Sequence, residues 1–165
     1  MIEDTPAIQD FYPDDAAHCY GCGRLNEVGL RLRTRWDGDE TVTRFTPAPH
    51  HTAIPGSVYG GMVASLLDCA GTGSASAAAL RAESREIGDG PSPRFVTAAL
   101  KVDFLKPTPL GPELEIRGRI VEMKGRKVVV EETLSADGVV TATGHVVAVR
   151  IRDDQTTPGV PSPQP

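Results

Sequence analysis

The order of hydrophobic and polar positions divides the chain into segments of different periodicity. Two short segments come first: residues 30–35, where leucine and threonine alternate with arginine, and residues 41–45, which follow an Asp-Gly turn signal. Residues 60–82 then contain no proline and consist mainly of alanine, leucine and other small residues. That stretch predicts one long helix, the only strong helix in the chain.

After a break rich in glycine, proline and serine at residues 88–93, the hydrophobic period becomes two. One face of the segment 96–104 is predicted to hold Val96, Ala98, Leu100, Val102 and Phe104, and the other face Thr97, Ala99, Lys101 and Asp103. Three more strand-like runs follow at residues 113–123, 127–135 and 139–151, separated by Gly125 and by Asp137-Gly138. Connections this short predict an antiparallel meander.

The predicted order is therefore two strands, one long helix and four strands, which belongs to the α+β class. An antiparallel sheet of about five to six strands can cover its apolar face by wrapping around that helix. The helix is rich in glycine and alanine, and such small side chains allow a curved sheet to approach closely.

One domain accounts for most of the chain. Residues 1–17 are acidic and contain two prolines, so we expect an N-terminal arm with little regular structure. Residues 153–165 contain four prolines and few apolar side chains, so we expect a disordered C-terminal tail. The folded domain is predicted to span residues 18–152, and it shows no internal repeat.

Composition and charge narrow the functional classes. The chain has 165 residues and a net charge of −5, and a negative charge argues against a general nucleic-acid-binding protein. No apolar run has the length of a membrane span, and no secretory signal is recognisable at the N-terminus. We therefore expect a cytoplasmic protein without a membrane partner, in which the three cysteines are reduced.

A charge inside the predicted helix is the most informative single residue. Asp68 lies among apolar residues at positions 66–70, and no other charge occurs in the helix before Arg81. Aspartate is unfavourable in a helix interior because its side chain competes for backbone hydrogen bonds, and burial without partners is costly. We interpret Asp68 as functional; the alternative is an exposed or salt-bridged side chain.

Helical spacing predicts the surroundings of this carboxylate. Residues three, four or seven positions from Asp68 are small or carry hydroxyls, including Ser65 and Thr72, which indicates a narrow, partly polar groove. The helix begins at Gly60-Gly61, whose N–H groups have no acceptor in the helix and lie at the positive end of its dipole. A carboxylate and such an anion-stabilising helix start can hydrolyse an activated acyl group. Gly60-Gly61 could equally be only a tight turn.

Residues 55–68, PGSVYGGMVASLLD, resemble the signature of hotdog-fold acyl-CoA thioesterases. They are most similar to the phenylacetic-acid-degradation (PaaI-like) type, whose pattern is P-G-x-x-H-G-G-x-x-x-x-L-x-D. Residues 19–30 resemble the C-x-x-C-G-x-x-N-x-x-G-L segment of many members, and residues 95–111 resemble the strand that follows the helix. The resemblance covers roughly residues 19–151.

The resemblance implies a sheet wrapped around the helix, and a homodimer or dimer of dimers with active sites between subunits. It implies that Asp68 is the general base or nucleophile and that the amide of Gly61 binds the thioester carbonyl oxygen. Thr97 matches a hydroxyl that positions water in some members, and Thr72 matches a residue that contacts the substrate in others. The implied substrate is an acyl-CoA with an aromatic or medium-chain acyl group, and no further cofactor is expected.

One position departs from the family signature, because Tyr59 stands where a histidine is usual. A tyrosine hydroxyl can orient the thioester by donating a hydrogen bond, but it does not exchange protons near neutral pH as an imidazole does. For the phosphates of coenzyme A we consider Lys106, Arg126 and Lys127, which are otherwise solvated turn residues. The remaining predicted substrate-binding residues are Gly60, Ser65 and Thr72.

Three other interpretations compete with hydrolysis. Loss of the motif histidine leaves open a non-catalytic acyl-CoA or hydrophobic-ligand binding protein on the same fold. A hydratase would pair a catalytic histidine with an acid; the spacing around His50-His51 does not fit, and we interpret these residues as a loop pair. Cys19 and Cys22, with His18 beside them, resemble half of a zinc site. No second pair of ligands lies at a useful spacing, so no metal is expected.

Overall fold

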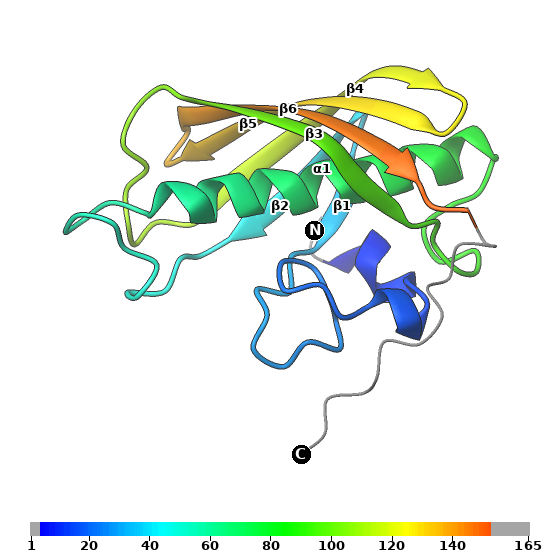
Figure 1. Cartoon of the computed structure of the whole chain (residues 1–165), viewed down its shortest axis with the longest axis horizontal. Coiled ribbons are helices and arrows are strands. Elements are labelled where there is room, and N and C mark those ends of the chain that lie inside the picture. The colour runs from blue at the N-terminus through cyan, green and yellow to red at the C-terminus, as the bar shows by residue number, and fades with distance from the viewer. Residues whose placement is uncertain (1–3, 153–165) are drawn as a thin grey trace.

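One helix, α1 (Gly60–Ala82), runs beneath a curved sheet (Figure 1). The computed structural model describes residues 4–152, so the predicted tail at 153–165 lies outside the described residues. The helix begins and ends at the residues predicted from the sequence. The other elements are the 3-10 helices η2 (Ile8–Phe11) and η3 (Asp14–Ala16) and the strands β1 (Thr34–Asp37), β2 (Glu40–Phe45), β3 (Phe95–Phe104), β4 (Leu114–Lys124), β5 (Lys127–Ala136) and β6 (Val139–Arg150).

The six strands form one antiparallel sheet in the order β1-β2-β4-β5-β6-β3. This confirms the predicted α+β class and number of strands. The turns from β4 to β5 and from β5 to β6 contain Gly125 and Gly138, whose φ angles of 58° and 76° are left-handed conformations that glycine adopts readily. After α1 the chain enters β3, which pairs only with β6 within the sheet and therefore forms its edge.

The small side chains of α1 allow the sheet to lie close to the helix backbone. Every residue from Cys69 to Leu80 is buried. A methyl group added at Gly71 would lie 2.6 Å from the Val146 side chain on β6, and one added at Gly73 would lie 2.6 Å from Thr34 on β1. The predicted close approach is therefore confirmed. No helix in the described part of the chain, α1 included, is long and apolar enough to cross a membrane.

The first strand begins later than the alternation at residues 30–35 predicts. Arg31 has a φ of 54°, which interrupts the extended backbone. The amides on either side of it donate hydrogen bonds to the carbonyls of Tyr20 (2.7 Å) and Gly21 (2.9 Å). This part of the chain therefore pairs with the segment around the first two cysteines, and β1 starts only at Thr34.

The N-terminal segment, for which little regular structure is expected, lies against α1 and β1 and contains η2 and η3. Ile8 is fully buried and Tyr12 is 2% exposed. The side-chain Nε2 of Gln9 donates to Oγ1 of Thr34 at 3.0 Å, and Gln9 Oε1 accepts from the Thr34 backbone amide at 2.8 Å. The segment is acidic overall, but its apolar side chains belong to the hydrophobic core.

A β-bulge in β3 changes the face on which Thr97 lies. The register of β3 with β6 shifts between Thr97 and Ala99, and strict alternation does not continue across such a shift. Val96, predicted on the same face as Leu100, is 47% exposed, whereas Leu100 packs against the core. Thr97 faces α1. The predicted division of faces is therefore wrong at the start of β3 and correct for Leu100 and Val102.

Candidate active site

Asp68 lies in the third turn of α1 and faces the edge strand β3. The hydroxyl of Thr97 donates a hydrogen bond to Oδ1 of Asp68 at 2.5 Å. The Asp68 side chain is only partly buried, so the protein holds one carboxylate oxygen while the group stays accessible from one side. The structure thus brings together two predicted site residues, and the bulge in β3 turns Thr97 toward the helix.

The start of α1 combines free backbone amides with the Tyr59 side chain. Tyr59 is the N-cap residue, and its carbonyl accepts hydrogen bonds from the amides of Met62 (2.9 Å) and Val63 (3.2 Å). The N–H groups of Gly60 and Gly61 have no acceptor within the helix, as helical geometry requires. A methyl group added at Gly61 would overlap the Tyr59 hydroxyl. The tyrosine hydroxyl and the Gly61 backbone therefore lie side by side.

Gly61 and Asp68 lie on one face of the helix but far apart along it. Seven residues at 1.5 Å each place them about 10 Å apart. Helical side chains lean toward the N-terminus, so the Asp68 carboxylate lies nearer to the Gly61 amide than this rise alone gives. Both residues therefore belong to the first three turns of α1, about two turns apart.

Two predicted substrate-binding hydroxyls are hydrogen-bonded to the helix itself. Ser65 Oγ donates to the carbonyl of Gly61 at 2.8 Å. Thr72 Oγ1 lies 3.2 Å from the carbonyls of both Asp68 and Cys69, and the residue is buried. These hydroxyls therefore have no donor left for a ligand, although each keeps acceptor capacity.

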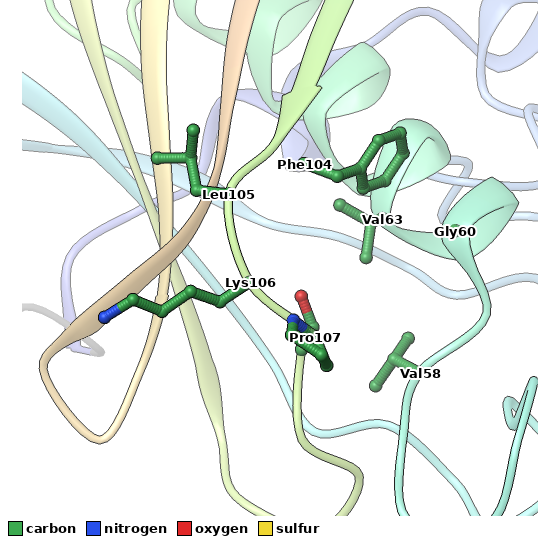
Figure 2. A pocket seen from close by; sticks show the side chains of 8 residues that line it. Val58, Gly60, Val63, Phe104, Leu105, Lys106 and Pro107 are labelled. Carbon is green, nitrogen blue, oxygen red and sulfur yellow. The ribbon is translucent and has the colours of Figure 1, made fainter.

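An open pocket of about 290 Å³ adjoins the start of α1 (Figure 2). Its walls come from the residues before the helix, from the helix itself and from the segment after β3, and the side chains are mainly apolar. The lining residues are Val58, Gly60, Val63, Phe104, Leu105, Lys106, Pro107 and Thr108. Because this pocket lies next to the Gly60-Gly61 amides, it suits an apolar group attached to a polarised carbonyl.

The predicted phosphate contacts do not come together within one chain. Lys106 follows the end of β3, and its ammonium points away from the helix start in Figure 2. Arg126 and Lys127 lie at the β4–β5 turn, near the beginning of β3, roughly 30 Å away by the length of the strand. Arg126 donates to the Arg150 carbonyl at 3.0 Å, and Lys127 pairs with Glu122 at 2.8 Å. The three predicted phosphate contacts therefore form two separate groups at opposite ends of β3.

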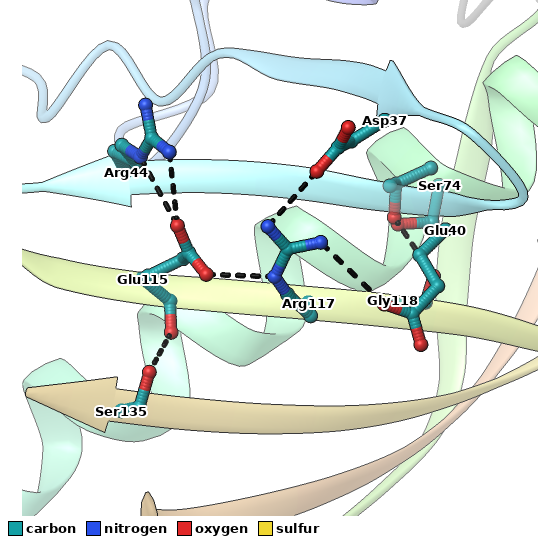
Figure 3. A network of polar contacts seen from close by, with 9 residues as sticks. Asp37, Glu40, Arg44, Ser74, Glu115, Arg117, Gly118 and Ser135 are labelled. Carbon is teal, nitrogen blue, oxygen red and sulfur yellow. Dashed lines mark hydrogen bonds and ion pairs between the residues drawn. The ribbon is translucent and has the colours of Figure 1, made fainter. Parts of the chain in front are cut away.

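A separate charged cluster lies on the outer face of β1, β2 and β4, away from the β3 edge (Figure 3). Arg117 binds Asp37 at 2.9 Å and Glu115 at 2.7 Å, and Arg44 binds Glu115 at 3.0 Å. Partial burial alone would raise the pKa of Glu115, but hydrogen bonds from both arginines outweigh it and lower that pKa. These charges stabilise the pairing of strands and take no part in the candidate site.

Sequence reasoning missed a second carboxyl group beneath the sheet, that of Glu132 on β5. It is 3% exposed, and neither of its carboxyl oxygens has a hydrogen-bond partner among residues 4–152. Burial first, then the negative charges of Asp68 and Glu131, raise the pKa of Glu132 well above its ordinary value. The signal was present: Val130 and Leu134 are buried and lie two positions to either side of residue 132, so that position falls in the buried register.

The structure also places a third thiol beside the Cys-x-x-Cys pair. The Sγ atoms of Cys19, Cys22 and Cys69 all lie within 4.8 Å of one another, and all three thiols are free. Hydrogen bonds from the other two thiols, and then from nearby backbone amides, lower the pKa of Cys19. The hydrogen bond with the Cys19 thiol raises the pKa of Cys22 to about 11. We call these residues the three-cysteine cluster.

Comparisons with known proteins agree with this fold. The family model described as thioesterase superfamily matches residues 55–143. A crystal structure of a thioesterase superfamily protein from Shewanella loihica is 51% identical, covers 87% of this chain and 99% of that chain, and has a TM-score of 0.67. No curated protein matches the sequence.

More distant solved structures share the fold. The PaaI protein from the phenylacetic acid degradation operon of E. coli is 19% identical over 74% of this chain and 81% of that chain, with a TM-score of 0.60. A thioesterase from Haemophilus influenzae is 13% identical over 79% of this chain and 85% of that one, with a TM-score of 0.62. The match to the family model and the close Shewanella relative decide the assignment. This chain, with six antiparallel strands around one helix, belongs to the thioesterase superfamily and has the hotdog fold.

Proposed function

We propose that this protein hydrolyses the thioester bond of an acyl-CoA with an aromatic or medium-chain acyl group. The observation that carries the proposal is the Asp68 carboxylate, held at Oδ1 by Thr97 and accessible from one side. Membership of the thioesterase superfamily supports the reaction class. The apolar pocket beside the helix start supports an acyl group of moderate size.

The reaction uses water as the nucleophile in its simplest form. Asp68 accepts a proton from a water molecule as the water oxygen attacks the thioester carbon. The carbonyl oxygen becomes an oxyanion, which accepts a hydrogen bond from the Gly61 amide and lies beside the Tyr59 hydroxyl. Collapse of this intermediate breaks the carbon–sulfur bond. The coenzyme A thiolate takes the proton from Asp68 and leaves with the free acid as second product.

In the proposed enzyme each site takes the Gly61 amide from one subunit and Asp68 from the other, and the edge strand β3 provides the contact. β3 presents an unpaired edge, and Val96 and Phe104 are 47% and 58% exposed. Antiparallel pairing with the same strand of a second copy would cover this edge and satisfy its backbone hydrogen-bonding groups. It would also place Thr97 and Asp68 of one subunit near the partner subunit's Phe104, which lies at the partner's helix start.

The test is Asp68→Asn, assayed for thiol release on a panel of acyl-CoAs that differ in chain length and aromaticity. Loss of the general base should lower kcat on the best substrate by about 100-fold or more. Asp103→Asn is the matched control, because Asp103 is an exposed carboxylate on the same strand as Thr97 and pairs with Lys101. Wild-type turnover by Asp68→Asn would refute the catalytic assignment.

A binding protein without turnover is the second candidate, and the tyrosine at position 59 favours it. The same panel separates the two functions. Micromolar binding of an acyl-CoA by the wild-type protein, with no release of free thiol over hours, would establish the binding protein and exclude hydrolysis.

A further inference from the structure

The three-cysteine cluster takes no part in the proposed hydrolysis, yet two distant parts of the chain meet at it. Cys69 follows Asp68 directly in α1, whereas Cys19 and Cys22 come from the loop before β1. Two sulfur atoms that are 50 residues apart in sequence, those of Cys19 and Cys69, lie 3.8 Å apart. Cys22 and Cys69 are buried, and Cys19 is half-buried, so the cluster opens to solvent on one side.

Glycines make this arrangement possible. A methyl group added at Gly21 would overlap the sulfur of Cys69, so only glycine allows the loop to approach the helix here. A methyl group added at Gly23 would lie 2.5 Å from the Ala17 carbonyl, and the Gly23 amide closes the turn by donating to the Cys19 carbonyl at 2.8 Å. Backbone amides of the same turn face the Cys19 sulfur. The loop therefore presents two sulfur atoms to the third one on the helix.

We propose that Cys19, Cys22 and Cys69 bind one Zn²⁺ ion as three thiolates, with the fourth coordination position open to a solvent molecule beside Cys19. Zinc–sulfur bonds of about 2.3 Å at tetrahedral angles place the sulfur atoms about 3.8 Å apart. The Cys19–Cys69 separation of 3.8 Å has this value, and the separations within 4.8 Å need only small movements. The proposal replaces the sequence-based expectation of no metal, which considered only two of the ligands.

The chemistry of the donors selects the ion. Three sulfur ligands favour zinc over magnesium or calcium, which prefer oxygen. Each thiol releases its proton to solvent as its sulfur binds the metal. A disulfide would be a competing use of the cysteines, but a sulfur–sulfur distance of 3.8 Å is far longer than a bond of about 2.05 Å.

Zinc at this position would connect the loop before β1 to the helix at the residue after Asp68. The ion would hold the turn of α1 that carries the proposed base without touching the substrate. Removal of zinc should therefore lower the thermal midpoint of unfolding, because binding to the folded state alone stabilises that state.

The test measures metal directly in protein purified under reducing conditions, without a histidine tag and with no added chelator. Metal analysis of the wild-type protein should find about one zinc per chain, as expected for one three-cysteine cluster. After removal of zinc with a chelator, addition of Co²⁺ should give the charge-transfer and visible bands of tetrahedral thiolate coordination. These spectra use the wild-type chain and do not depend on whether any variant folds.

Variants then assign the ligands. Cys69→Ala and Cys22→Ala should each lose the bound metal and most of the cobalt spectrum, with folding checked by circular dichroism. His18→Ala is the matched control, because this exposed imidazole neighbours Cys19 in sequence without joining the cluster, and it should keep the metal. The proposal would be overturned if the wild-type protein bound neither zinc nor cobalt. It would also be overturned if the Cys69→Ala variant kept the metal. Another metal bound by the same cysteines would overturn the choice of zinc.

Discussion

At the scale of single residues, two carboxyl groups lie near each other in different surroundings. Asp68 is partly exposed and accepts a hydrogen bond from Thr97. Glu132 is enclosed by the sheet and the helix, and its oxygens have no partner in the described part of the chain. A carboxyl group without partners in an apolar interior is held in its neutral form, since ionisation there is costly. Asp68 is therefore the carboxyl group that a substrate can reach, whereas Glu132 affects mainly the stability of the fold.

Glu132 should make the protein less stable as the pH rises. Its pKa is higher in the folded state than in the unfolded state, so the unfolded chain binds fewer protons between the two values. The free energy of unfolding should then fall by up to about 1.4 kcal/mol per pH unit above the unfolded pKa, and level off above the folded pKa. Glu132→Gln should remove this contribution, measured by urea unfolding from about pH 5 to about pH 8.

Glu131→Gln is the matched control for this measurement. Glu131 precedes Glu132 but points outward, where its carboxylate binds His145 at 2.6 Å. The control should keep most of the pH dependence that Glu132 causes, because burial is the largest cause of the raised pKa and the charge of Glu131 only the third. Equal slopes in the wild type and in Glu132→Gln would show that Glu132 is not buried in its neutral form.

At the scale of elements, the packing of α1 against the sheet depends on positions without side chains. Gly71 lies opposite Val146 on β6, with no room for a methyl group between them. The helix interior would otherwise disfavour glycine, since alanine is better there by about 1 kcal/mol. The sheet can wrap around the helix because contact between elements outweighs helix propensity at such positions.

Gly71→Ala should therefore destabilise the protein, despite its better helix propensity. Overpacking against Val146 is expected to cost about 1–3 kcal/mol in the free energy of unfolding, measured with denaturant. Val146→Ala makes room, so the double variant should be more stable than the sum of the two single effects predicts. Additive effects, or a stabilising Gly71→Ala, would contradict the close packing of α1 and β6.

At the scale of the whole molecule, the proposed activity belongs to a pair of subunits. Each site would take its amide from one copy and its carboxylate from the other. A homodimer with two such sites follows from the symmetry of the contact through β3. A single chain would contain both residues but no complete site.

Mixing two inactive variants tests this arrangement. Asp68→Asn removes the base, and Gly61→Pro removes the amide hydrogen. The backbone of the first helical turn accepts proline, and the exposed Tyr59 side chain has to turn aside to make room for the ring. When the two proteins are unfolded together and refolded in equal amounts, half of the dimers are mixed, and each mixed dimer keeps one intact site. Thiol release should then recover to about a quarter of the wild-type value per subunit. No recovery from a mixture shown to contain mixed dimers would place both residues in one chain.

The sequence by itself determined the elements whose signals are local. The bounds of α1 follow from the absence of proline and the Gly-Gly start, and the strands from alternation between turn residues. Asp68 was recognisable because a charge in an apolar helix contrasts with its immediate neighbours. These features depend on residues a few positions apart, where periodicity is informative.

Only the tertiary structure decided which distant residues meet. The bulge in β3 turned Thr97 toward Asp68, Cys69 joined a pair 50 residues away, and Lys106 was separated from Arg126 by the length of the sheet. Each outcome depends on register, strand order or close approach of the backbone, which periodicity along one segment does not contain. Local patterns specify the elements, whereas the packing of the sheet around the helix specifies the site.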